Sequence, residues 1–244
     1  GYIDPSVICG RHGTGAVSDG GSGKWKYHFP YDWHGLPSPE YVLDYTNDGS
    51  TDSPGGRYPA QYEGFARLSA VPKTQKTPRL IATEPTAHQW MQQGCMRTLR
   101  ECVSRSFLRY AIDFTDQGKS RELCLKASKT RSLATIDLSE ASDRVSCWLV
   151  ERAFRRNPSI LNILHATRTR LLQNPIDKKT QSVIALRKFA MMGSAVTFPV
   201  QSILFAGLAV AAVIFTRTHV EKRKCTLRRA AREVRVYGDD IIVP

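Results

Sequence analysis

Two adjacent carboxylates near the end of the sequence are the residues best suited to chemistry. Asp239 and Asp240 follow Gly238 between two β-branched runs, which predicts a hairpin with both carboxylates at its tip. Adjacent carboxylates repel each other, but a hard divalent cation such as Mg²⁺ converts that repulsion into coordination because it prefers oxygen ligands. Solvent also tolerates such a pair at an exposed turn, so the pattern leaves a metal site and a plain surface turn both open.

A third carboxylate, Asp137, is expected near the end of a short apolar strand that begins at about residue 132. A serine-rich turn follows, and a helix is then predicted from the spacing of Val145, Trp148, Leu149 and Ala153. A single aspartate at a strand end is more often a turn former or a helix cap than a catalyst. If this strand packs beside the hairpin, however, Asp137 and Asp239 converge on one site.

The segment before the hairpin is a long apolar run. No charged residue lies between Lys188 and Arg217, and residues 195–215 are about long enough to span a bilayer. The basic residues that follow would suit a cytoplasmic anchor, so a membrane span has to be considered.

Polar residues at the start of this run favour a different reading. Ser194, Thr197 and Gln201 have the spacing of one polar helix face. We expect Gly193 to loosen the preceding loop and Pro199 to disturb the first helical turns. A lone membrane span has no neighbour to satisfy such a polar face. We therefore interpret the run as a buried helix whose polar side lines a cavity.

Positive charge dominates the sequence, with 35 Lys and Arg against 22 Asp and Glu, a net charge of +13 and a pI near 9.7. Such a chain attracts polyanions, of which nucleic acid is the commonest. Lys73, Lys76 and Arg79 lie in a proline-flanked loop that suits a triphosphate, although a solvated surface loop is the simpler reading. A second basic stretch, 216–235, reads as an RNA-facing helix or, as we favour, a solvated surface helix.

The overall composition, with 41% hydrophobic and 23% charged residues, is that of a globular protein. The six cysteines lack zinc-site spacing and are too sparse for a disulfide scaffold, so we expect reduced thiols and a cytosolic location. The first residues do not resemble a signal peptide, and the glycines of 10–23 lack P-loop spacing.

Residues 86–110 are predicted to be helical. The absence of an initiator Met and the final apolar run suggest a fragment.

Four segments in a fixed order resemble motifs F, A, B and C of viral RNA-dependent RNA polymerases: residues 71–85, 133–146, 191–209 and 236–242. In particular they resemble the replicase beta subunit of the single-stranded RNA bacteriophages, the Q-beta-like leviviruses. The sequence RHGTGAVS at 11–18 is similar to the glycine-rich fingers motif of that family. Because Gly-Asp-Asp alone occurs widely by chance, the order and distances of the four segments carry the resemblance.

The resemblance implies an α+β right-hand polymerase fold with fingers and palm, the palm being an antiparallel sheet with flanking helices. We expect fingers over 1–130, including the basic nucleotide-binding loop 71–85, and palm with motif A over 131–156. A fingers insertion over 157–190 and palm with motifs B and C over 191–244 would follow. The chain would then end before motif D, with the thumb missing.

The resemblance also implies two Mg²⁺ ions, with Mn²⁺ as a substitute. Asp137 and Asp239 would be the principal metal ligands, helped by Asp240 and the carbonyl of Leu138, and the three aspartates would be the catalytic residues. The residues expected at the incoming nucleotide are Lys73, Lys76 and Arg79 at the triphosphate, and Asp143, Ser194, Thr197 and Gln201 at the ribose 2′-hydroxyl, together with Gly193.

The implied reaction is template-directed addition of ribonucleoside monophosphates to an RNA 3′ end, for phage genome replication in the cytoplasm of an infected bacterium. Its partners would be RNA template and product, ribonucleoside triphosphates and host translation factors, with no membrane. The alternatives are a reverse transcriptase, a noncatalytic RNA-binding module and a basic membrane-anchored protein that uses residues 195–215 as its span.

Overall fold

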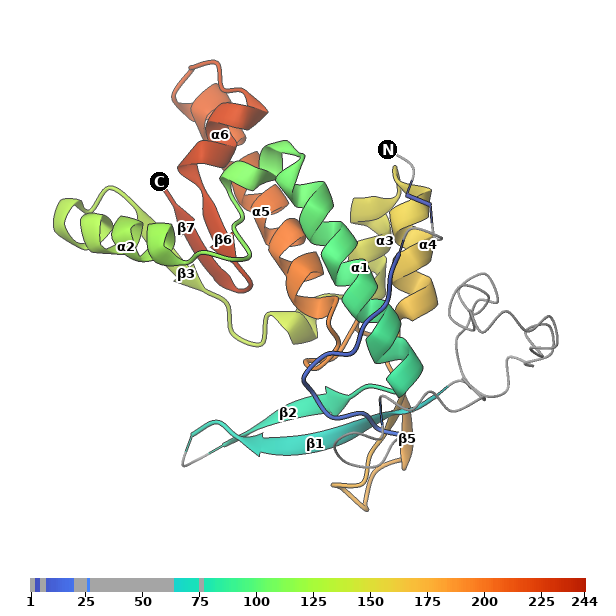
Figure 1. The fold of residues 1–244 in the computed structure, drawn as a ribbon. Helices are drawn as coiled ribbons and strands as arrows, with labels where there is room; N and C mark the ends of the chain where they lie inside the picture. Colours follow the sequence, from blue (N-terminus) through green and yellow to red (C-terminus); the bar gives the residue numbers. More distant parts are fainter. Residues whose placement is uncertain (1–2, 5–7, 20–25, 27–63, 75–76) are drawn as a thin grey trace. The chain divides into compact units, whose positions relative to one another are not determined.

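The computed structural model describes residues 3–4, 8–19, 26, 64–74 and 77–244 (Figure 1). Lys76 and most of the expected fingers segment before residue 64 lie outside the described residues. The chain forms two compact units, each built from two stretches of sequence. Unit 1 comprises residues 1–96 and 145–197, and unit 2 comprises residues 97–144 and 198–244. These bounds differ from the expected fingers and palm segments, whose assignment stays a prediction.

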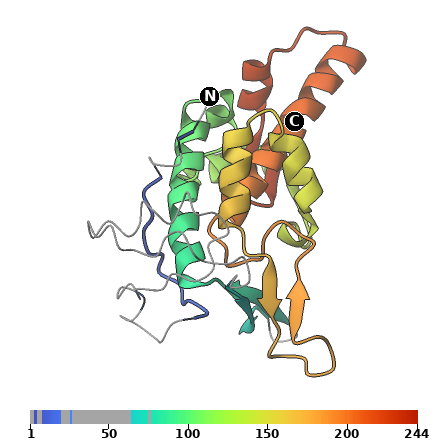
Figure 2. The ribbon, with the colours of Figure 1, turned by 90° about the vertical axis from the view of Figure 1, so that its right-hand side faces the viewer.

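Unit 1 contains a four-stranded sheet with the order β2-β1-β4-β5. Its strands are β1 (Ala66–Pro72), β2 (Pro78–Thr83), β4 (Leu171–Gln173) and β5 (Val183–Ala185). β1 pairs with β2 in an antiparallel and with β4 in a parallel manner, and β4 and β5 form the antiparallel pair visible in Figure 2. The predicted proline-flanked basic loop is the turn between β1 and β2. Both Lys73 in that turn and Arg79 on β2 are exposed.

Three helices accompany this sheet in the sequence of unit 1: α1 (Thr86–Ser104), whose last turns belong to unit 2, α3 (Cys147–Phe154) and α4 (Pro158–Thr167). α1 buries Met91, Cys95, Leu99 and Val103, which recur every fourth residue along one face. α3 and α4 pack side by side (Figure 2). The Ser146 hydroxyl caps α3 by accepting a hydrogen bond from the backbone N–H of Leu149.

The helix predicted over 86–110 is too long. α1 ends at Ser104, and a separate 3₁₀ turn, Phe107–Tyr110, follows. The reason is local, because the Ser106 side chain accepts a hydrogen bond from the backbone N–H of Leu108 and so starts a new turn. Serine competes with the helical hydrogen-bond ladder in this way, which the apolar periodicity alone does not reveal.

A buried polar network in unit 1 joins the residue after β2, helix α1 and the segment after α4. The Glu84 carboxylate accepts hydrogen bonds from the Thr169 hydroxyl and, at 3.1 Å, from Nε2 of Gln92. Nδ1 of His88 lies 2.7 Å from the Thr169 hydroxyl oxygen, which extends the network to the imidazole. Burial raises the pKa of the Glu84 carboxyl, and the hydrogen bond from Thr169 is the largest effect opposing it.

Unit 2 contains a three-stranded antiparallel sheet with the order β3-β7-β6. Its strands are β3 (Ala134–Asp137), β6 (Arg235–Tyr237) and β7 (Asp240–Val243). Its helices are α2 (Gly118–Thr130), α5 (Thr197–Phe215) and α6 (Leu227–Glu233). Ala206, Val210 and Val213 of α5 form the core of the unit together with Val236 of β6 and Ile241 of β7. One face of the short sheet therefore rests on α5.

The long apolar run forms α5, as predicted, but the helix starts at Thr197. Pro199 does not disturb it, because the residue lies in the first turn, where backbone N–H groups have no helical partner. A continuous helical stretch, Thr197–Val220, is long and apolar enough to cross a bilayer, and no other helix of the described residues is. Half of its most apolar 18-residue stretch is buried inside the structure, as in a core helix, so the membrane-anchored alternative has only weak support.

The polar network of unit 1 predicts a specific loss of stability. Thr169→Val keeps the side-chain shape but leaves Glu84 and His88 without their shared hydroxyl, so we expect a loss of about 1–3 kcal/mol in the free energy of unfolding. Denaturant unfolding followed by circular dichroism measures it. Ser128→Ala, at an exposed position on α2, is the matched control and should change stability by less than about 0.5 kcal/mol. Equal effects of the two substitutions would contradict a stabilising network.

Candidate active site

The sheet of unit 2 places three polar residues in one row. Asp137 on β3 is directly opposite Asp240 on β7, which in turn is opposite Tyr237 on β6. Directly opposed residues have Cβ atoms about 4.5–5.5 Å apart, so the two carboxylates are neighbours on the same face. Asp239 precedes Asp240 in the turn between β6 and β7. The predicted hairpin and its pairing beside the Asp137 strand are confirmed (Figure 1).

Asp240 interacts electrostatically with both other carboxylates. Burial raises the pKa of Asp240, and the negative charges of Asp239 and Asp137 raise it further, in that order. The sequence predicted convergence of Asp137 with Asp239, whereas the register makes Asp240 the residue directly opposite Asp137. The three acidic groups are thus close enough to repel one another, a repulsion that a bound cation would relieve.

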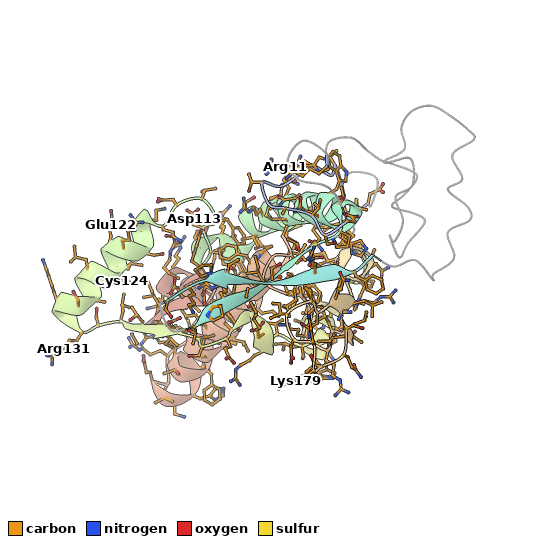
Figure 3. All side chains as sticks on the ribbon, turned by 90° about the horizontal axis from the view of Figure 1, so that it is seen from below. Arg11, Asp113, Glu122, Cys124, Arg131 and Lys179 are labelled. Atoms are coloured by element: carbon orange, nitrogen blue, oxygen red, sulfur yellow. The ribbon has the colours of Figure 1, made fainter. Side chains whose placement is uncertain are left out.

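A pocket of about 360 Å³ opens on this face of the sheet between the strands and α2. Asp137, Asp240 and Tyr237 line it from the strands, and Arg121 and Cys124 line it from α2. Figure 3 shows Glu122 and Cys124 along α2 and Arg131 at its end. Asp239 is exposed but does not line this pocket. The pocket has the size of a small-ligand site and carries both charge signs.

Residues in the first turns of α5 support the turn that carries Asp239. Gly238 has a φ of +67°, and a Cβ atom there would lie 2.8 Å from the Phe198 ring, so only glycine fits. The Gly238 backbone N–H donates to the Ser202 hydroxyl at 3.0 Å, and that hydroxyl donates to the Phe198 carbonyl at 2.9 Å. Phe198 also packs edge-on against Tyr237.

Ser202 and Phe198 were not among the predicted site residues. Ser202 is fully buried and follows Phe198 by one helical turn, a spacing visible in the sequence. Nothing in the sequence alone shows that this helix face meets the hairpin turn, since that contact depends on tertiary packing. Gln201, which was predicted, is buried, and its amide nitrogen lies 3.8 Å from where a Gly238 Cβ would be.

Two other predicted residues of unit 2 lie near the end of β3. Leu138 directly follows β3 and packs, half-buried, against the core around α5. Asp143 is exposed on the 3₁₀ turn Ser142–Arg144 and does not line the pocket. The structure therefore brings Asp137, Asp239 and Asp240 together, with Leu138 next to Asp137 and Gln201 beside Gly238, and leaves Asp143 on a neighbouring turn.

The remaining predicted nucleotide-binding residues belong to unit 1. Gly193 has a φ of +125°, and a Cβ atom there would lie 1.9 Å from the Ala82 carbonyl oxygen, so the backbones of this loop and β2 approach each other closely. The Ala82 N–H also donates to the Met192 carbonyl at 2.8 Å. Thr197 donates from its hydroxyl to the Met191 carbonyl at 2.8 Å.

The expected polar helix face is wrong at one position. Ser194 lies in the turn before α5, whose first residue is Thr197, because Gly193 and the Ser194 N–H to Met191 carbonyl hydrogen bond form a turn there. Ser194 is buried, and its hydroxyl has no hydrogen-bond partner in the structure. A buried hydroxyl without a partner is costly, which makes Ser194 a polar group available to a ligand.

The carboxylate chemistry suits Mg²⁺. Among the described residues, no three His, Cys, Asp or Glu side chains are already gathered into a metal-binding group. Magnesium, however, is usually held by one or two carboxylates together with substrate phosphates and water. The opposed pair Asp137 and Asp240, with Asp239 adjacent, offers the oxygen ligands that such a site requires.

Comparison with known proteins gives relatives that are all replicase subunits of RNA phages. The chain is 34% identical over 180 residues to the RNA-directed RNA polymerase subunit beta of Escherichia virus Qbeta. The matched residues make up 74% of this chain and 27% of that protein. It is 33% identical to the corresponding subunit of Enterobacteria phage SP, over 71% of this chain and 26% of the relative. For the RNA-directed RNA polymerase beta chain of Escherichia phage MS2 the identity is 32%, over 71% and 28%.

The chain thus spans less than a third of the length of these relatives. The family model described as "RNA replicase, beta-chain" matches residues 48–244, which include both the carboxylate row and the β1–β2 turn. That match covers most of the sequence, and the chain belongs to the RNA replicase beta-chain family.

Proposed function

We propose that this chain supplies the catalytic carboxylates of an RNA-directed RNA polymerase that replicates a phage genome. The observation that carries the proposal is the row in which Asp137 opposes Asp240, with Asp239 in the adjoining turn. The relatives, which bear the name RNA-directed RNA polymerase, support the same reaction class. The reaction is template-directed addition of ribonucleoside monophosphates to an RNA 3′ end.

Asp137 and Asp239 would hold two Mg²⁺ ions, or Mn²⁺ in their place, assisted by Asp240 and the Leu138 carbonyl. Such ions, when bound, lower the pKa of the attacking hydroxyl and neutralise the triphosphate. The chain's own contribution is positioning: the β3–β7 ladder fixes Asp137 against Asp240. The Ser202 hydroxyl and the Phe198 ring fix the turn that bears Asp239. Preorganised charge of this kind costs no rearrangement during the reaction.

Nucleotide binding is assigned to the residues that the family resemblance singles out. Lys73, Lys76 and Arg79 would bind the triphosphate through charge. Gly193, Ser194, Thr197, Gln201 and Asp143 would contact the nucleotide and its ribose. Support comes from the unpartnered Ser194 hydroxyl and from the position of Gln201 beside Gly238. RNA template, RNA product and host translation factors would be the partners, in the cytoplasm of the infected bacterium.

A reverse transcriptase is the alternative within the same chemistry. It would need the same carboxylates but would prefer deoxyribonucleotides, so ribose selection separates the two. A noncatalytic RNA-binding module would need neither the carboxylates nor a divalent cation.

The carboxylates should be essential to nucleotide addition. In the complete replicase subunit, Asp137→Asn and Asp239→Asn should each lower the rate of primer extension by at least about a hundredfold, because each removes charge that holds the cations. RNA affinity should be unchanged. Asp177→Asn, at an exposed carboxylate in the loop between β4 and β5, is the control and should retain full activity. Normal extension by either site variant would exclude the proposed mechanism.

Ser202 should act as a positioning residue. Ser202→Ala removes the acceptor for the Gly238 N–H, so we expect extension to fall about tenfold and the Mg²⁺ concentration for half-maximal rate to rise. Ser202→Thr keeps a hydroxyl, so its Mg²⁺ concentration for half-maximal rate should be close to that of the wild type. Its larger side chain should still lower the free energy of unfolding. Ser104→Ala, where an exposed hydroxyl bonds only a helical carbonyl, is the control. A purely structural role would lower the amount of active enzyme and leave the Mg²⁺ dependence unchanged.

Gln201 should contribute to the choice of ribose. Gln201→Leu keeps the volume but removes the amide beside Gly238, so the KM for ribonucleoside triphosphates should rise severalfold while that for deoxyribonucleotides changes little. Steady-state incorporation of matched ribo- and deoxyribonucleotides on one RNA template measures the ratio. Gln173→Leu, at an exposed residue of β4, is the control. A wild-type preference for deoxyribonucleotides would favour the reverse transcriptase instead.

A further inference from the structure

A tyrosine surrounded by arginines lies on the surface of unit 2. The 3₁₀ turn Phe107–Tyr110 packs against α6. The guanidinium carbon of Arg109 lies 4.9 Å from the centre of the Tyr110 ring, and that of Arg232 lies 4.8 Å from it. Arg109 also donates to the Tyr110 hydroxyl at 2.9 Å. The ring is half-buried against the core, so the arginines are held in place by a fixed platform.

The two faces of α6 differ in how their charge is compensated. Arg229 lies 3.7 Å from Glu233, and Glu233 is also paired with Arg217 at 2.8 Å. Arg228 and Arg232, four residues apart on the adjacent face of the helix, are exposed. Within the part of the chain that the structure describes, no ion pair joins Arg109, Arg228 or Arg232 to a carboxylate. We call these three residues with Tyr110 the Arg-Tyr surface.

The missing compensation has an electrostatic consequence. Hydrogen bonds from Arg109 and then Arg232, together with the charge of Arg228, lower the pKa of the Tyr110 hydroxyl to about 8. Cations held near one ring repel one another, and among the described residues no ion pair to a carboxylate relieves that repulsion. An external anion would offset it.

The Arg-Tyr surface is distinct from the carboxylate site. α6 ends one residue before β6, whereas the turn with Asp239 follows the other end of that strand (Figure 1). The two features lie at opposite ends of β6, about 10 Å of strand apart. None of the four residues of the Arg-Tyr surface lines the pocket beside Asp137.

We propose that the Arg-Tyr surface binds the backbone of single-stranded RNA outside the active site. Guanidinium groups recognise phosphate through paired N–H donors, and their planes also stack on unpaired bases. The combination of several uncompensated arginines with an aromatic ring favours nucleic acid over an acidic protein segment, which needs charge alone. The proposal rests on the proposed function for the presence of RNA, but binding here requires no catalysis.

The test is RNA binding by the complete replicase subunit. The triple variant Arg109→Gln, Arg228→Gln, Arg232→Gln should bind a fluorescent twelve-nucleotide oligouridylate about tenfold or more weakly than wild type at 0.15 M salt. The slope of log affinity against log salt should become shallower by about 2, since three phosphate contacts are lost at about 0.7 each. Fluorescence anisotropy measures both quantities.

The matched control removes three cations elsewhere. Lys178→Gln, Lys179→Gln and Arg187→Gln, at exposed positions around β5 that include Lys179 in Figure 3, should change the RNA affinity less than twofold. Equal losses in both triple variants would show an effect of net charge only and would overturn the proposal. Competition by polyglutamate as strong as by oligouridylate would also overturn it, in favour of an acidic protein partner.

A second measurement locates the RNA directly. Ultraviolet cross-linking of a 4-thiouridine oligonucleotide, followed by peptide mass spectrometry, should label peptides of residues 107–110 and 227–233. Tyr110→Phe should keep the affinity within about twofold because the platform remains, whereas Tyr110→Leu should weaken binding severalfold. Asp239→Asn should cross-link normally, so failure of the catalytic proposal and failure of this one give different results. Cross-links confined to other peptides would exclude the Arg-Tyr surface.

Discussion

The main constraint on the structure of unit 2 is that like charges meet across one pair of opposed residues in a short antiparallel sheet. Asp137 and Asp240 face each other at a register position, and Asp239 adds a third charge one residue away. Such a row is unfavourable unless other interactions fix it. The opposite face of the same strands provides them, because Val236 and Ile241 are buried against α5. A slip of one residue would move the carboxylates into that core. Burial of the apolar face therefore fixes the register that places the carboxylates opposite each other.

α5 performs two structural tasks along a single stripe. Its first turns present Phe198 and Ser202 to the hairpin turn, and its later turns present Ala206 and Val210 to the core. These residues recur every fourth position, so they share one face of the helix. Any displacement of the core packing would therefore also change the support of the turn at Gly238. This coupling explains why a helix of nearly uniform hydrophobicity carries a fully buried serine.

The sequence predicted the parts of this arrangement that follow from local patterns. The hairpin around Gly238, the strand that ends at Asp137 and the apolar helix over most of 195–215 are confirmed because each has a strong local signal. The break after Ser104 and the turn at Ser194 were missed, since a serine hydroxyl and a close approach to β2 decide them. Which aspartate opposes Asp137 depends on strand register, and that is set by tertiary packing.

The buried network around Glu84 and the surface around Tyr110 show the same limit of sequence reasoning in opposite settings. Glu84 and Thr169 are distant in sequence, and only the fold brings the carboxylate to the hydroxyl that offsets its burial. On α6, the basic run looks uniform in sequence, yet Glu233 neutralises one face and leaves the other without a counter-charge. Composition gives the net charge of a segment, but its effect on a ligand depends on which cations already have partners. The distribution of acidic partners, which only the fold supplies, therefore distinguishes a solvated helix from a surface that attracts a polyanion.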